Sequence, residues 1–96
     1  MAVRFPARLN RRNALEASDV VVKDFSPEGV KILASQRFSL FDHLSISFAP
    51  ANNTAAIAMN GHVVWIDKDN FGAWHIGVKF DQIDLMKANR VMEFLE

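Results

Sequence analysis

One set of polar residues has the types and the spacing of a binding turn: Asp24, Ser26 and Gly29, in the pattern Asp-x-Ser-x-x-Gly. A carboxylate only accepts hydrogen bonds, and it can take two parallel N–H donors such as those on the Watson–Crick edge of guanine. The hydroxyl can bond a phosphate or a backbone group, and glycine allows a positive φ and the close approach of a ligand. The same residues also fit a simple turn, in which Asp and Ser cap the reversal and Gly completes it.

A group of arginines precedes this turn and carries the complementary chemistry. Arg4 with Arg8, and Arg8 with Arg12, form R-x-x-x-R patterns, and no acidic residue comes before Glu16. Guanidinium groups pair bidentately with phosphate and stack on planar bases, which lysine does poorly. A solvated basic tail is the alternative interpretation.

The elements that must position these residues are short strands. The β-branched run 20–22 before the turn and the alternation of Val30 and Ile32 after it predict a strand on each side. The weaker alternation over 2–10 predicts a first strand or an extended arm, and Pro6 favours a sheet edge. Strands are thus expected within 2–10, 14–24, 29–34, 44–48, 55–59, 62–66 and 74–80.

The connections and the C-terminal part complete this pattern. We expect turns at 50–53 and at Asn60-Gly61, a favoured hairpin pair, and a polar loop over 67–72. From Asp81 onward apolar residues recur at helical spacing, which predicts a helix over 82–96 with Asp81 or Asp84 at its start. The face of Leu85, Met92 and Leu95 either covers the strands or meets a partner. The fold class is therefore mainly β, a small antiparallel barrel closed by a terminal helix.

Composition narrows the function. Ninety-six residues make a single domain, and eleven basic against eleven acidic residues argue against a general DNA or RNA binder. The sequence has no cysteine, no stretch long enough to enter a membrane and no signal-peptide pattern, so we expect a cytoplasmic protein. No nucleophile–base set is visible, so we expect no enzyme and no cofactor.

The remaining aromatic and imidazole residues have structural interpretations. His43, His62 and His75 lack the spacing of metal ligands, so no metal site is expected. Trp65 and Trp74 flank the last loop and are expected to pair across that hairpin. Four phenylalanines are assigned to the core: Phe38, Phe41, Phe48 and Phe80.

Taken together, these motifs resemble the PilZ domain family. The resemblance rests on R-x-x-x-R followed by D-x-S-x-x-G, and it continues through the segments 40–48, 61–65 and 76–80 and the helix after them. It implies a six-stranded antiparallel barrel that binds cyclic di-GMP, a bacterial second messenger, as a non-catalytic receptor. In the family the arginines lie on an arm ahead of a full strand, whereas here the same residues also fit the first strand.

The resemblance also implies roles for residues. Asp24 would accept guanine N–H groups, Ser26 would bond phosphate or base, Gly29 would leave room, and Arg8 with Arg4 or Arg12 would clamp a stacked pair of ligands. Ordering of the arginine arm would signal to an unidentified effector protein in motility or biofilm regulation. The alternative is a PilZ-like adaptor that binds proteins and no nucleotide.

Overall fold

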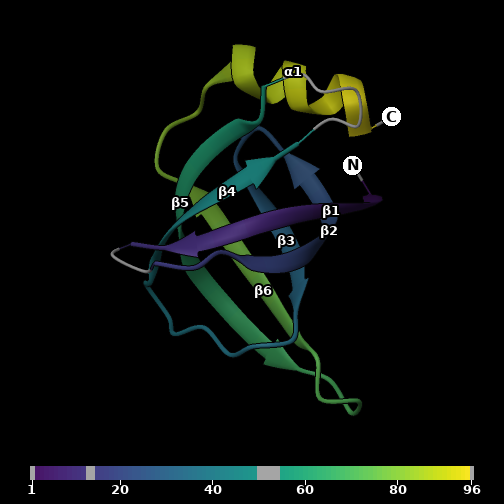
Figure 1. The fold of residues 1–96 in the computed structure, drawn as a ribbon, viewed down its shortest axis with the longest axis vertical. Helices are drawn as coiled ribbons and strands as arrows, with labels where there is room; N and C mark the ends of the chain where they lie inside the picture. The colour runs from purple at the N-terminus through teal and green to yellow at the C-terminus, as the bar shows by residue number, and fades with distance from the viewer. Residues whose placement is uncertain (1, 13–14, 50–54, 96) are drawn as a thin grey trace.

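A computed structural model describes residues 2–12, 15–49 and 55–95. Six antiparallel strands close into a barrel in the order β1-β2-β3-β6-β5-β4, as the resemblance to the PilZ family implied, and the segments 55–59 and 62–66 belong to one strand (Figure 1). The elements are β1 (Ala2–Arg11), β2 (Ser18–Ser26), β3 (Gly29–Ala34), β4 (His43–Phe48), β5 (Ile57–Lys68), β6 (Trp74–Phe80) and α1 (Leu85–Leu95). Helix α1 lies across one end of the barrel, and the β5–β6 hairpin extends beyond the other end.

The core forms because each strand alternates apolar and polar residues, so one face of every strand points into the barrel. Phe25, Phe48 and Phe80 meet inside it, and the rings of Phe25 and Phe48 contact edge to face with centroids 5.6 Å apart. Among the described residues, no buried side chain is polar or charged. The polar and charged side chains of the described residues are therefore all at least partly exposed.

The segment that fitted either an arm or a strand is strand β1. It pairs with β2 along its length, whereas β4 pairs only with its second half, from Arg8 to Arg11. Pro6 lies in the first half, where a missing N–H costs no hydrogen bond to a second neighbour. Pro6 therefore lies where β1 pairs with β2 but not with β4, which is the edge position expected for it.

The turn expected at Asn60-Gly61 is wrong, because β5 runs through these residues without interruption. Gly61 is needed for packing instead: a Cβ there would lie 2.5 Å from the carbonyl oxygen of Lys79 on β6. The turn expected at 50–53 lies outside the described residues.

The core assignment of the phenylalanines is right for three of the four and wrong for Phe41. Phe41 is 71% exposed and has a φ of 68°, in the left-handed region. Hydrogen bonds between its N–H and the carbonyl of Val63, and between the N–H of Val63 and the carbonyl of Asp42, tie this turn to β5. The backbone turns here to enter β4, and the Phe41 side chain is left outside.

Helix α1 covers the barrel, which decides between the two alternatives for its apolar face. Asp84 begins the helix, since its carboxylate accepts the backbone N–H of Lys87 at 3.0 Å, as an N-cap does. Ala88 and Val91 are buried in the core, with Met92 and Leu95 packed against them, whereas Leu85 is 59% exposed and takes no part. Within the described segments, no helix has the length and apolar character to cross a membrane.

Candidate functional site

The predicted turn joins β2 to β3 directly. Ser26 is the last residue of β2 and Gly29 the first of β3, and the Ser26 hydroxyl donates a long hydrogen bond, 3.4 Å, to the carbonyl of Gly29. A Cβ at Gly29 would lie 2.3 Å from the carbonyl oxygen of Val78. Gly29 is therefore required by the close approach of β6, and its φ is not positive.

A β-bulge turns the polar residues of the motif outward. The register of β2 with β3 shifts between Val22 and Asp24, so the buried positions pass from Val20 and Val22 to Phe25. Without the extra residue, strict alternation would put Asp24 and Ser26 inside the barrel and Phe25 outside. The bulge therefore exposes the carboxylate and the hydroxyl and places an aromatic ring in the core.

A second bulge acts in the same way on β5. The register of β5 with β6 shifts between Val63 and Trp65, after which Ile66 packs against the core and Trp65 is 41% exposed. Trp65 would otherwise continue the row of buried odd-numbered residues on this strand. It lies instead across from Gly77 on β6, and not across from Trp74, whose register partner is Lys68. The expected pairing of the two tryptophans is therefore wrong.

Register brings the motif and Trp65 onto one outer face of β2, β3, β6 and β5. One row of successive register partners contains Asp24, Lys31, Gly77 and Trp65. The neighbouring row contains Ser26, Gly29, Lys79 and His62. A shallow groove of about 550 Å³ lies over these rows, and we call it the motif groove; it is lined by Asp24–Ser26, Glu28–Lys31, Val64, Trp65 and Gly77–Lys79.

The indole of Trp65 lies flat on the sheet because Gly77 has no side chain. A Cβ at Gly77 would stand 2.0 Å from the indole nitrogen of Trp65, well inside contact distance. The ammonium of Lys31 lies 5.7 Å from the centroid of the Trp65 ring, within the range of a cation–π interaction. The groove thus offers an aromatic surface with a positive charge beside it.

Both signs of charge are present in the motif groove. Lys31 and Lys79 point outward from its centre, on β3 and β6, while Asp24 and Glu28 lie toward the β2–β3 turn. An anionic ligand group would be attracted to the lysines, and N–H donors would be attracted to the carboxylates. The groove is therefore suited to a ligand that carries both kinds of group.

The three predicted arginines are not gathered in this groove. Arg4 is exposed on β1, two residues along from Ala2, the register partner of Asp24. Arg8 forms an ion pair with Asp19, with 3.4 Å between Nε and Oδ1. Arg12 follows the end of β1, where its N–H donates to the carbonyl of His43.

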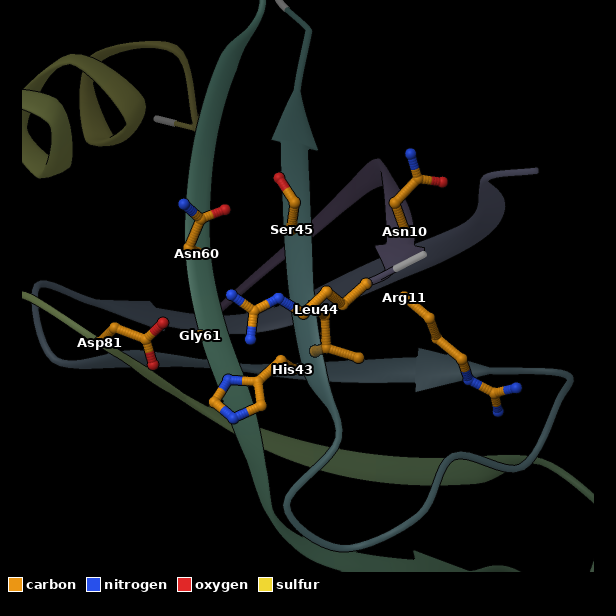
Figure 2. A pocket seen from close by; sticks show the side chains of 9 residues that line it. Asn10, Arg11, His43, Leu44, Ser45, Asn60, Gly61 and Asp81 are labelled. Atoms are coloured by element: carbon orange, nitrogen blue, oxygen red, sulfur yellow. The ribbon is translucent and has the colours of Figure 1, made fainter. Parts of the chain in front are cut away.

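Arg12 lines a separate cavity of about 490 Å³ on the face of β1, β4 and β5, which we call the second groove. Its lining residues are Asn10–Arg12, His43–Ser45, Asn60, Gly61 and Asp81. Asn10, Ser45 and Asn60 are register neighbours on three adjacent strands, and Figure 2 shows their side chains above His43, with Arg11 pointing away. The guanidinium of Arg11 instead stacks on Phe38, 4.4 Å from the ring centroid, and pairs with Asp42.

Two of the three histidines each contact one carboxylate. His62 contacts Asp81 and His75 contacts Asp69, each at 3.0 Å. Across the described segments, no group of three or more His, Cys, Asp or Glu side chains is placed to hold a metal ion.

The sequence interpretation missed Lys31, Trp65, Gly77 and Lys79 as site residues. A signal for the bulge in β2 was available, because Phe25 is a large apolar residue between polar Asp24 and Ser26 and breaks the alternation set by the valines. The bulge in β5 had a weaker signal in the sequence: Trp65 follows two consecutive valines, which interrupt the alternation of apolar and polar residues. No local pattern links β5 to the motif, because that pairing exists only in the closed barrel.

Comparison with protein families gives one match. The family model "PilZ domain" matches residues 1–96, so the chain belongs to the PilZ family, which comprises receptors for cyclic di-GMP that act as non-catalytic binding modules. A search of curated proteins found no match.

Proposed function

We propose that this protein is a non-catalytic receptor for cyclic di-GMP and that the motif groove is its binding surface. The observation that carries the proposal is that Asp24, Ser26 and the exposed face of Trp65 share one open groove with two lysines. Few other ligands need hydrogen-bond acceptors, an aromatic surface and positive charge together, as a guanine nucleotide does.

Each residue of the motif has a chemical role in this proposal. Asp24 accepts the N1–H and N2–H groups of a guanine, and Ser26 bonds a phosphate or the same base. Gly29 keeps the groove floor low beside them. Trp65 provides a flat surface on which a guanine stacks.

The arginines enter the proposal unequally. Arg4 is the arginine we assign to the site, because it lies on β1 close to the level of Asp24 and its guanidinium can stack on the guanine held there. Arg8 would have to leave Asp19, and Arg12 lines the second groove. We therefore do not assign a phosphate clamp to these two side chains.

The proposed signal follows from the same placement. Arg4 and Arg8 already lie in a paired strand, so ordering of these residues would not report on the ligand. We propose that an effector protein reads the occupied groove itself. A base stacked on Trp65 would change the shape and charge of that face.

The two tryptophans allow a direct test. In the Trp74→Phe variant, Trp65 is the single remaining tryptophan, and its fluorescence should change on titration with cyclic di-GMP. The matched Trp65→Phe variant keeps Trp74, which lies outside the groove, and its fluorescence should not respond. An unchanged signal from Trp65, together with unchanged NMR positions for residues 24–31, would overturn the proposal.

The alternative is an adaptor that binds proteins, and one observation favours it. Pro6, Val21 and Leu33 are register neighbours on the outer face of β1, β2 and β3, and they line an apolar groove with Phe71, which is 95% exposed. Contiguous exposed apolar groups often mark protein contacts. A negative nucleotide titration would favour this second function.

A further inference from the structure

The width of the motif groove indicates how a ligand would lie in it. Asp24 is on β2 and Trp65 is on β5, with β3 and β6 between them. Three strand spacings separate the two residues, about 14 Å. Because the indole lies over Gly77 on β6, its aromatic surface begins about two spacings from Asp24, or about 10 Å. A single base cannot contact both ends.

The space between the two ends carries positive charge. Lys31 is the register partner of Asp24 on one side and of Gly77 on the other, and Lys79 is the partner of Gly29. Both lysines therefore lie between the carboxylate end and the indole end. Among the described residues that line this groove, Lys31 and Lys79 are the cationic ones.

We propose that the motif groove binds one molecule of cyclic di-GMP in an open, extended form that lies across β2, β3, β6 and β5. One guanine is held by Asp24 and the other is stacked on Trp65, and the phosphates of the central ring lie over Lys31 and Lys79. The inference rests on the proposed function, and it adds the number of bound molecules, their conformation and the residues that hold the phosphates.

The chemistry at the Asp24 end also sets specificity. Guanine presents two adjacent N–H donors to a carboxylate, whereas adenine presents an unprotonated ring nitrogen at the corresponding position, which a carboxylate repels. Cyclic di-AMP carries the same phosphates and a comparable stacking surface. It is therefore the ligand that separates recognition at Asp24 from attraction by the lysines and Trp65.

The position of the cations argues for one molecule and against a stacked pair. No arginine lines the motif groove among the described residues, and Arg4, on β1 beside it, is assigned to the base that Asp24 holds, so no further guanidinium is placed to cap a second layer of bases. Both lysines project from barrel strands at the level of the groove floor. The groove volume of about 550 Å³ lies within the usual range for one small ligand.

Isothermal titration calorimetry of the whole protein with cyclic di-GMP provides the test. One ligand molecule should bind per chain, and Lys31→Gln and Lys79→Gln should each weaken binding about tenfold through loss of a charge-assisted contact. Lys68→Gln is the matched control, because Lys68 lies 5.3 Å from the ring of Trp74 outside the groove and should bind as the wild type does.

The ends of the groove are tested by two further measurements. Trp65→Ala should lose about tenfold in affinity, since one stacked base is lost. Cyclic di-AMP should bind far more weakly than cyclic di-GMP.

The possible failures can be told apart. Two molecules per chain, or wild-type affinity in both lysine variants, overturns the extended single ligand while leaving the receptor proposal standing. Wild-type affinity in Trp65→Ala also overturns the extended conformation, because a compact ligand bound at Asp24 alone would then explain the affinity. If cyclic di-GMP does not bind at all, the receptor proposal fails and the further inference fails with it.

Discussion

The motif groove and the second groove differ first in their floors. The motif groove lies over Gly29 and Gly77, where two adjacent strands lack side chains, and it is flanked by two bulges. The second groove lies over regularly paired β4 with Leu44 in its floor, and polar side chains rise from it at every outward position. Both grooves hold acids and cations, so charge does not separate them.

What separates the grooves is the exposed aromatic ring. The bulge in β5 turns Trp65 outward, and Gly77 leaves it room to lie flat. The described residues that line the second groove supply imidazole, amide and hydroxyl groups but no large aromatic surface. An irregularity in strand pairing, rather than a concentration of charge, therefore gives the barrel surface an aromatic ring on which a base could stack.

The largest expected effect comes from the carboxylates of the two grooves. Asp24→Asn should weaken cyclic di-GMP binding roughly 100-fold, because an amide presents a donor to guanine where an acceptor is needed and the charge is lost. Asp81→Asn in the second groove should leave the affinity within about twofold of the wild type. Calorimetry on both variants checks this. Equal losses of affinity in the two variants would contradict the assignment of the ligand to the motif groove.

The floor of the motif groove can be altered through Gly77. Gly77→Ala should destabilise the protein by about 1–3 kcal/mol, because the added methyl group overlaps the indole of Trp65. In the Trp65→Ala background the same substitution should cost much less. Thermal unfolding of both single variants and of the double variant measures the coupling.

Additive losses in that double-variant cycle would contradict the contact between Trp65 and Gly77. Gly61→Ala serves as a comparison in the second groove, because its Cβ would meet the backbone of Lys79. Its destabilisation should therefore remain when Trp65 is replaced.

The β5–β6 hairpin carries Trp65 on one strand and Lys79 on the other, and Asp69 holds its loop. The backbone N–H groups of Phe71 and Ala73 and the ring of His75 donate to Asp69 at 2.8–3.0 Å. These contacts lower the pKa of Asp69 below its ordinary value of 3.8. The hydrogen bond from the Phe71 N–H lowers it most, and the hydrogen bond from His75 is the next largest cause.

A carboxyl group with a lowered folded-state pKa stabilises the fold above its unfolded pKa and loses that contribution as the pH falls through the folded value. Asp69→Asn should therefore lower the melting temperature at pH 7 by a few degrees. The difference from the wild type should narrow near pH 3. A difference that is the same at both pH values would contradict the assignment.

The smallest effect is expected from the arginine of the second groove. Arg12→Gln should change cyclic di-GMP affinity by less than about twofold, because Arg12 follows the end of β1 that lies farthest from Ala2, the register partner of Asp24, and a cation at that distance is screened. Arg4→Gln should have a larger effect, about threefold to tenfold, through loss of stacking on the guanine. Calorimetry measures the affinity of both variants. A larger loss of affinity in Arg12→Gln than in Arg4→Gln would show that the second groove takes part in binding.

Local sequence determined the strands and the helix, since the alternation at Val30 and Ile32, the period of α1 and the cap at Asp84 need only neighbouring residues. The spacing of Asp24, Ser26 and Gly29 along the chain also identified them as a candidate binding turn. Asn60-Gly61 and Phe41 were misread because contacts with β6 and β5, far away in the sequence, override local preference at those positions.

Only the closed barrel decided which side chains lie together in the motif groove. The bulges in β2 and β5 set the direction of Asp24 and Trp65, and the pairing of β3 with β6 brings Lys31 and Gly77 between them. Arg8 and Arg12 were separated from the motif for the same reason, because antiparallel pairing puts Ala2 level with Asp24 and carries the rest of β1 away from it. Strand register is a property of pairing between distant segments, and residue types and spacing along the chain do not contain it.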